Sequence, residues 1–194
     1  MTADPPDQLA IAPAPVTELT APSNLVSRGL ENVARIDESA DAQYAMGDRY
    51  RTGRGVPQDD VQAVVWFRKA AEHGHAEAQF NLGLSYVHGL GVPRDDVLAA
   101  VWLRKAAEQG HAEAQCCLGQ MVTLGRGVPQ DEVQAAVWLR KAAEQGYAEA
   151  QCLLGHMYGF GRGVPQDEVQ AAVWFRKAAE QGPQIYKQRL WRSR

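Results

Sequence analysis

The stretch GVPQDEVQAAVWLRKAAEQG, residues 127–146, decides the fold because close copies of it recur along the chain. Its first three residues, Gly-Val-Pro, also stand at 55–57, 91–93 and 163–165, so copies follow one another at steps of 36 residues. The same step relates Trp66, Trp102, Trp138 and Trp174, and it relates Gly74, Gly110, Gly146 and Gly182. Four repeats therefore tile residues 42–185, with boundaries at 42–77, 78–113, 114–149 and 150–185.

Each repeat predicts two helices, of which the second is the clearer. In the third repeat Asp131 is a suitable N-cap, and Gln134 follows it at the spacing of a capping box. Gly146 suits the left-handed position just after the helix. Apolar residues recur at i, i+3, i+4 and i+7, which predicts one apolar stripe made of Ala135, Trp138, Leu139 and Ala142.

The first helix of each repeat is expected to be shorter, as in residues 78–86. A glycine lies inside it in every repeat, at Gly47, Gly83, Gly119 and Gly155. Glycine inside a helix costs about 1 kcal/mol relative to alanine. Four such costs predict a gain elsewhere, which we expect to be close approach to the paired helix. The glycines of the following Gly-x-Gly-Val-Pro loop permit positive φ angles.

One pair of helices cannot bury its apolar stripe, whereas stacked pairs share a continuous core. The fold class predicted is therefore all-α: an αα-hairpin solenoid, or superhelix, with divergent helical caps. Residues 23–41 are expected to form an N-terminal capping helix after a disordered Pro- and Ala-rich leader at 1–22. A divergent final helix is expected at 185–191, and residues 186–194 form a basic C-terminal end.

Composition excludes several classes of protein. The net charge of −3 and the pI near 6.0 argue against a generally basic surface for nucleic acid. The sequence contains no apolar run of about 18 residues, the length needed to span a membrane. Three cysteines are too few for a disulfide framework. The first basic residue is Arg28, so no secretory signal is visible. This favours a cytoplasmic location, with a periplasmic or secreted one left open if a leader is missing from the sequence.

The repeat resembles the Sel-1-like repeat family, relatives of the tetratricopeptide repeats. The resemblance rests on Ala-x-Ala-Gln-x-x-Leu-Gly, on Gly-x-Gly-Val-Pro-x-Asp and on Ala-x-x-Trp-x-x-Lys-Ala-Ala-Glu-Gln-Gly, and it covers about three quarters of the chain. It implies a curved superhelix that serves as an adaptor for protein complexes, often in bacterial signalling, envelope regulation or host interaction. It implies no reaction and no cofactor.

Differences between the repeats concentrate on one side of the first helix, whereas the second helices are almost identical. In related helical solenoids the first helices line a concave groove, so we hypothesise that this side binds a protein or peptide partner. Drift on a solvent face, or ordinary packing between repeats, explains the variation equally well. The candidate partner-binding residues are Asp48, Arg49, Asn81, Leu84, Ser85, His88, Gln120, Met121, Leu124, His156, Met157 and Phe160.

Catalytic and metal sites find little support in the sequence. No His pair stands at i, i+4 and no Cys-x-x-Cys occurs, so we expect solvent-exposed histidines and no metal. Cys116 and Cys152 are expected to be small buried apolar groups. The alternative function is β-lactam binding or hydrolysis, linked to cysteine-rich members of the family. Their paired cysteines and the Lys-Thr-Gly motif are absent, and Ser85 with His88 makes only a weak candidate pair.

Overall fold

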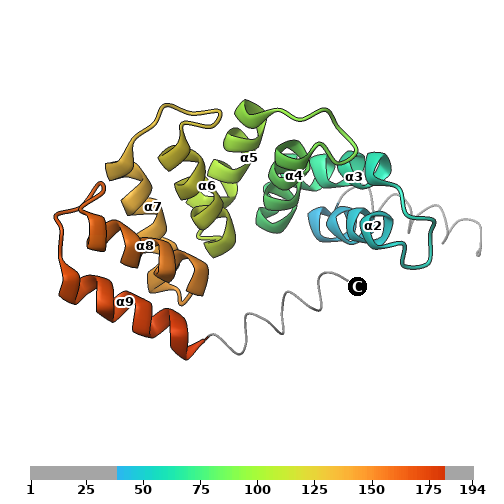
Figure 1. The fold of residues 1–194 in the computed structure, drawn as a ribbon. Coiled ribbons are helices and arrows are strands. Elements are labelled where there is room, and N and C mark those ends of the chain that lie inside the picture. Colours follow the sequence, from blue (N-terminus) through green and yellow to red (C-terminus); the bar gives the residue numbers. More distant parts are fainter. Residues whose placement is uncertain (1–38, 182–194) are drawn as a thin grey trace, which may run out of the picture. The chain divides into compact units, whose positions relative to one another are not determined.

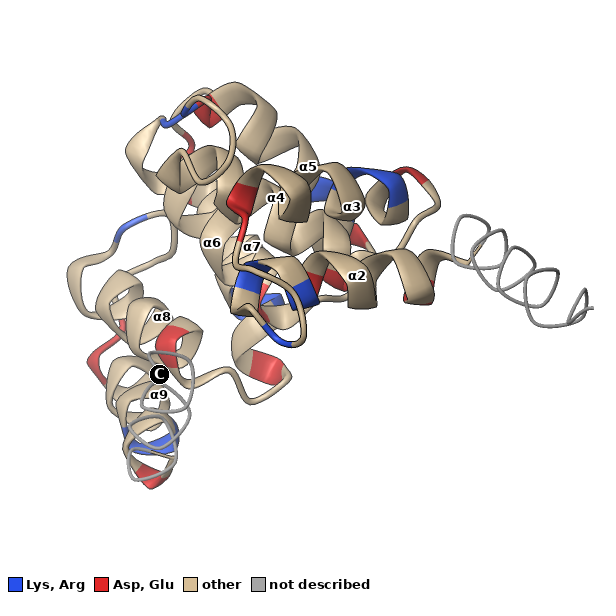
Figure 2. Cartoon of the chain, turned by 90° about the vertical axis from the view of Figure 1, so that its right-hand side faces the viewer, with Lys and Arg blue, Asp and Glu red and all other residues tan. Residues whose placement is uncertain are grey.

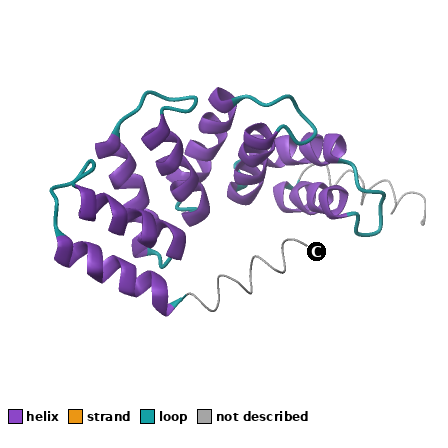
Figure 3. Cartoon of the chain, in the orientation of Figure 1, coloured by secondary structure: helices purple, strands orange, loops and turns teal. Residues whose placement is uncertain are grey.

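The computed structural model describes residues 39–181, all of which belong to one compact unit. Within that range the chain forms eight α-helices and no strand (Figure 3). The first helices of the four repeats are α2 (Ala40–Thr52), α4 (Ala76–His88), α6 (Ala112–Leu124) and α8 (Ala148–Phe160). The second helices are α3 (Asp60–Glu72), α5 (Asp96–Glu108), α7 (Glu132–Glu144) and α9 (Glu168–Glu180). The all-α prediction is confirmed for these residues.

Several predicted segments lie outside the described residues. They are the leader at 1–22, the part of the N-terminal capping helix before Ser39, and the C-terminal segment, including the helix expected at 185–191. The described chain starts at Ser39, whose hydroxyl accepts a hydrogen bond from the Ala42 amide and caps α2.

Consecutive helices pack on one another along the chain, from α2 on α3 to α8 on α9. Within this unit they follow an arc, with α2, α4, α6 and α8 on its inner side and α3, α5, α7 and α9 on its outer side (Figure 1). We call the first group the inner layer. This arrangement matches the solenoid predicted from stacked helical pairs.

The caps of the second helices are those the sequence predicts. The Asp131 carboxylate accepts from the Gln134 amide at 2.9 Å, and Asp59, Asp95 and Asp167 cap α3, α5 and α9 in the same way. Gly146 has a φ of +88°, the left-handed conformation expected after α7. The predicted stripe faces the core, since Ala135, Leu139 and Ala142 are buried.

The expectation of a shorter first helix is wrong, because all eight described helices have 13 residues. The helix predicted at 78–86 extends to Ala76–His88. The imidazole of His75, a residue absent from the usual list of strong N-caps, caps this helix through Nδ1, which accepts from the Ala78 amide at 3.1 Å. Sequence reasoning missed this cap and therefore placed the start of the helix too late.

The glycine inside each first helix serves the close approach that the sequence predicts. A Cβ built on Gly83 would lie 2.7 Å from Cγ of Leu103, and one on Gly119 would lie 2.8 Å from Cγ of Leu139. Both leucines come from the second helix of the same repeat and are buried. Glycine therefore lets a large side chain of the partner helix pack directly against the backbone of the first helix.

The loop glycines join neighbouring repeats. Gly127 has a φ of +67°, and a Cβ there would lie 2.0 Å from the backbone oxygen of Asp96, the first residue of α5. Gly91 and Gly163 approach Asp60 and Glu132 in the same way. Each of these loops therefore rests on the start of the second helix one repeat earlier, where a side chain would not fit.

Buried glutamines hydrogen-bond across every junction between repeats. Gln79, Gln115 and Gln151 each donate from Nε2 at 3.0 Å to the backbone oxygen of an alanine near the end of the preceding second helix. Their Oε1 atoms accept from Gln109, Gln145 and Gln181 at 2.7, 2.8 and 3.3 Å. In the first repeat His73 replaces the second glutamine, and its Nδ1 lies 3.0 Å from Oε1 of Gln43. We call these linked amides the glutamine ladder; its inner members are at most 4% exposed.

Ion pairs strengthen the second and third junctions but not the first. The Asp96 carboxylate binds Arg126 at 2.9 Å, and Glu132 binds Arg162 at 2.7 Å, in both cases across one repeat. At the first junction Leu90 stands in place of the arginine, and Asp60 makes no ion pair among the described residues. A hydrogen bond from Arg126, together with a smaller effect of the one from Arg94, lowers the pKa of Asp96 from 3.8 to about 2.

Replacing Gln115 with methionine is expected to lower the free energy of unfolding by about 1–3 kcal/mol. Methionine fills a similar volume but leaves the Ala107 oxygen without its side-chain donor and Gln145 without its acceptor. Urea unfolding followed by circular dichroism measures the change. Gln134→Met, on the exposed side of α7, is the control, with an expected effect within about 0.5 kcal/mol. Equal effects of the two substitutions would contradict a structural role for the glutamine ladder.

Because the pKa of Asp96 is lowered in the folded chain, its carboxylate stabilises the fold above the unfolded pKa near 4. That contribution is lost as the pH falls from about 4 to about 2. Asp96→Asn should therefore be less stable than the parent at pH 6, and the difference should vanish near pH 2. Asp60→Asn, at the junction without an arginine, is the matched comparison, and urea unfolding at several pH values measures both variants. An Asp96→Asn destabilisation that is the same at pH 6 and pH 2 would contradict the role of the Asp96 carboxylate.

Candidate functional site

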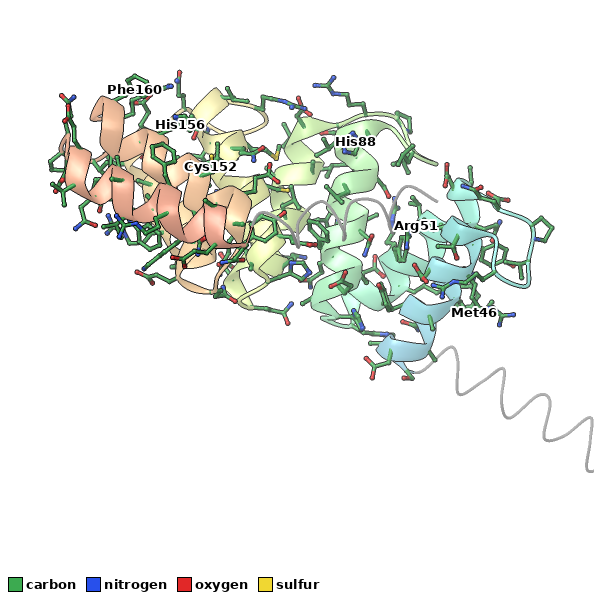
Figure 4. The ribbon with its side chains drawn as sticks, turned by 60° about the horizontal axis from the view of Figure 1, so that its bottom comes forward. Met46, Arg51, His88, Cys152, His156 and Phe160 are labelled. Atoms are coloured by element: carbon green, nitrogen blue, oxygen red, sulfur yellow. The ribbon has the colours of Figure 1, made fainter. Side chains whose placement is uncertain are left out.

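The twelve predicted binding residues lie on the inner layer but do not form one uniform surface. Phe160 and Leu124, at the ends of α8 and α6, are 73% and 65% exposed. Figure 4 shows Phe160 and His156 at one end of the array, Arg51 at the other and His88 between them. The apolar residues therefore gather in the third and fourth repeats and the charged ones in the first, as the sequence indicates.

Five of the predicted residues line a single open pocket of about 550 Å³ between α6 and α8. They are Gln120, Leu124, His156, Met157 and Phe160. Thr123, Leu139, Leu153 and Arg162 complete the lining. We call this the α6–α8 pocket. Pockets of this size hold small molecules or individual side chains of a protein partner.

The α6–α8 pocket has an apolar floor and an exposed apolar rim. Leu139 of α7 and Met157 of α8 form part of the floor and are 2% and 6% exposed, whereas Leu124 and Phe160 stand on the rim. The His156 ring stacks on Phe160 with centroids 6.2 Å apart and meets the edge of Phe175 at 4.9 Å. These ring contacts hold Phe160 beside the opening.

The polar groups of the lining are held by contacts outside the pocket. Gln120 donates to Glu149 at 3.1 Å, which ties α6 to the start of α8. Arg162 binds Glu132 of α7 at 2.7 Å, and the Thr123 hydroxyl donates to the Gly119 oxygen. Because these polar groups already have hydrogen-bond partners in the protein, covering them with an apolar group of a partner costs little free energy.

The expectation that all twelve residues are accessible is wrong for three of them. Ser85, Met121 and Met157 are 7%, 5% and 6% exposed and belong to the packing between repeats. These residues occupy equivalent positions in α4, α6 and α8, and all three side chains are buried. The packing explanation left open by the sequence therefore applies to them, whereas Leu124 and Phe160 are not packing residues.

The remaining predicted residues lie outside the α6–α8 pocket. Asp48 forms ion pairs with Arg51 and Arg54, and Arg49 donates to the Arg54 oxygen at 3.2 Å. In α4 the Asn81 amide donates to the Glu77 oxygen at 2.8 Å, Leu84 is half-buried and His88 is exposed. The polar side chains of Asp48, Arg49 and Asn81 therefore bond to groups of their own helix or of the loop that follows it.

Sequence reasoning missed four residues of the lining. Arg162 lies in a loop that the repeat pattern treats as a turn, and Leu139 belongs to the core stripe. Leu153 lies at a position that varies between repeats, and this variation was the available signal for it. Thr123 carries no such signal on its own.

The expectation of exposed histidines is confirmed for His73, His88 and His156 but is wrong for His75 and His111, which are half-buried. His111 caps α6 through Nδ1, contacts Glu77 of the preceding repeat through Nε2 at 2.7 Å, and stacks on Phe80. His75 has the same surroundings, with Asp41 and Tyr44. These two histidines therefore join repeats.

Chemistry beyond binding finds little support among residues 39–181. No group of three or more potential metal ligands gathers there. The buried Ser85 hydroxyl donates to the Asn81 oxygen of its own helix, so it is not directed at His88. The three thiols are free. Burial raises the pKa of Cys116 well above its usual range and that of Cys117 to about 12.

Charges and hydrophobicity of the described surface agree with the composition. In the view of Figure 2 basic and acidic residues are interspersed over the helices, without a continuous basic stripe. None of the described helices has the length and apolar character needed to cross a bilayer.

A family model described as the Sel1 repeat matches residues 40–75, 76–111, 112–147 and 148–183. These boundaries stand two residues before those chosen from the sequence, which marks a different phase of the same 36-residue period. No curated protein sequence matches the chain.

Solved structures share this architecture. A protective antigen of uropathogenic Escherichia coli with an SLR fold is 43% identical and has a TM-score of 0.74, over 80% of this chain and 33% of its own. The chain thus spans about one third of that protein. A Sel1 repeat protein from Oxalobacter formigenes is 36% identical (TM-score 0.71, covering 81% and 70%). Cysteine-rich protein B of Helicobacter pylori is 26% identical (TM-score 0.52, covering 64% and 90%).

Because thiolates are the reactive form of cysteine, burial should protect two of these thiols. In the folded protein at pH 8 we expect iodoacetamide to modify Cys116 and Cys117 roughly a hundredfold more slowly than in urea. Peptide mass spectrometry of samples quenched over time measures both rates. Equal rates with and without urea would show that these thiols are accessible, contrary to their placement in the structure.

Proposed function

Because this chain belongs to the Sel1 repeat family, we propose that it is a non-catalytic scaffold that binds a partner protein or peptide on its inner layer, with the α6–α8 pocket as the anchoring site. Proteins of this family are generally protein-interaction scaffolds and generally non-catalytic. The proposal goes further by assigning the binding site to particular residues of the third and fourth repeats.

The observation that carries the proposal is the exposure of Leu124 and Phe160 beside an apolar pocket. These large apolar side chains are 65% and 73% exposed, and contact of apolar surface with water is unfavourable. The core does not need them, because Leu139 and Met157 already fill the space beneath. Exposed apolar groups around a pocket with an apolar floor are typical of a site that receives a side chain of another protein.

Internal comparison of the repeats supports the same site. Positions equivalent to Phe160 carry Thr52 in the first repeat and His88 in the second, so the inner layer becomes apolar only toward the α6–α8 pocket. A structural role common to all repeats would favour the same residue at each position, as it does for the glycine inside each first helix. The difference therefore supports a role specific to one part of the array.

The test replaces both exposed anchors, as Leu124→Glu with Phe160→Glu. Burial of each anchor on binding contributes about 1.5–3 kcal/mol to the binding free energy. We therefore expect the double substitution to lower the affinity for the partner by at least about a hundredfold. Helicity should not change, because both side chains are exposed. Met157 is unsuitable for the test, since a charge at this buried position would destabilise the fold.

The matched control introduces the same two charges on the outer side, as Val133→Glu with Val169→Glu, where the side chains are 64% and 73% exposed. Proteins captured from the native host by the parent and both variants are compared by quantitative mass spectrometry, and affinities are then measured with the purified partner. A partner lost only with the Leu124 and Phe160 variant is the expected result. A partner retained by that variant contradicts the assigned site, and no partner for the parent contradicts the scaffold function.

A further inference from the structure

The outward side of α9 differs from the corresponding side of every earlier second helix. Ala136, Leu139 and Ala143 of α7 are 3%, 2% and 1% exposed, and the matching residues of α3 and α5 are similarly buried. In α9 the equivalents Ala172 and Ala179 are exposed and Phe175 is 36% exposed. We call these three residues the end face. No described helix follows α9, so nothing in residues 39–181 covers the end face.

Polar groups around the end face also lack the partners that earlier repeats supply. Asp96 and Glu132 bind an arginine of the following repeat, but the equivalent Glu168 has no ion pair within residues 39–181. The indole nitrogen of Trp174 is buried and finds no hydrogen-bond acceptor in the described part of the chain. A buried indole N–H without an acceptor is unusual, which indicates that a further group belongs beside α9.

The chain itself offers a segment of suitable chemistry. Residues 183–194 read PQIYKQRLWRSR and carry four large apolar residues, four basic residues and no acidic one. Tyr186 and Leu190 stand at i, i+4, the spacing that places two side chains on one side of a helix. The basic residues are Lys187, Arg189, Arg192 and Arg194. Their charge complements Glu168 and the carbonyl end of α9.

We propose that residues 183–194 dock on the end face, with Tyr186 and Leu190 against Ala172, Phe175 and Ala179. The segment does not reproduce an interior first helix. One 36-residue step places Tyr186 and Leu190 where α8 has the buried Ala150 and Leu154, so the first of these positions carries a larger side chain in the segment.

Hydrogen exchange of the 194-residue protein and of a chain ended at Gly182 tests this contact. Covered helices open less often, so amides of α9 should exchange at least about tenfold faster in the shortened chain, while those of α4 and α5 keep their rates. Equal rates in α9 would overturn the proposal. Faster exchange throughout the array would overturn it too, because a general loss of stability would then explain the change in α9.

A matched pair of variants separates apolar docking from a general effect of charge. Tyr186→Glu with Leu190→Glu should accelerate exchange in α9 as the shortening does. Gln184→Glu with Gln188→Glu adds the same charge on the opposite side of the segment and should leave α9 protected. Equal acceleration by both pairs would overturn the contact through Tyr186 and Leu190.

A second copy of the chain could cover the same end face, and this alternative has its own signature. Coverage within one chain is independent of protein concentration, whereas coverage by another chain follows mass action. We expect exchange rates in α9 to be the same at about 5 and about 500 µM, with one sedimenting species at both. Protection of α9 that rises with concentration, together with a dimer, would overturn the proposal in favour of a second copy.

Discussion

The buried amides of the glutamine ladder are the contacts on which the stacking of repeats depends. An amide in the core must satisfy both its donor and its acceptor, or the desolvation of the unpaired group opposes folding. Gln115 meets this demand only when α5 supplies a backbone oxygen and Gln145 supplies an N–H. A shift of the third repeat against the second would break the bond to Ala107 and leave the Gln115 N–H without its acceptor, whereas the bond from Gln145 lies within the third repeat. The glutamine ladder therefore fixes the register of an apolar interface that would otherwise tolerate sliding.

The exact period of the sequence separates the positions that maintain the fold from those free to vary. The second helices carry the alanines, the caps and the large residue opposite the inner glycine, so they are nearly identical in the four repeats. The exposed positions of the inner layer contribute neither to core packing nor to helix capping. Selection can change them without cost to the core, and the α6–α8 pocket arises where Leu124 and Phe160 occupy two of them.

The sequence alone predicts the period, the caps of the second helices and the glycines inside the first helices, because these depend on local chemistry and a fixed spacing. It does not reveal the histidine caps, because histidine is not among the usual N-cap residues and its second partner, Glu77 or Asp41, lies one repeat away. Met121 and Met157 share a helix side with exposed residues, so periodicity groups them together. Only the packed structure shows that these two side chains are covered.

The junctions of this array are chemically unequal, and the pocket lies at a well-connected one. In a stack of repeats each interface contributes separately to stability. At the first junction Leu90 replaces the arginine, whereas at the third Arg162 joins the loop after α8 to α7 and Gln120 joins α6 to α8. Both contacts also hold residues of the pocket lining. The bonds that couple the third and fourth repeats therefore keep the walls of the α6–α8 pocket in place before a partner arrives, which reduces the ordering cost of binding.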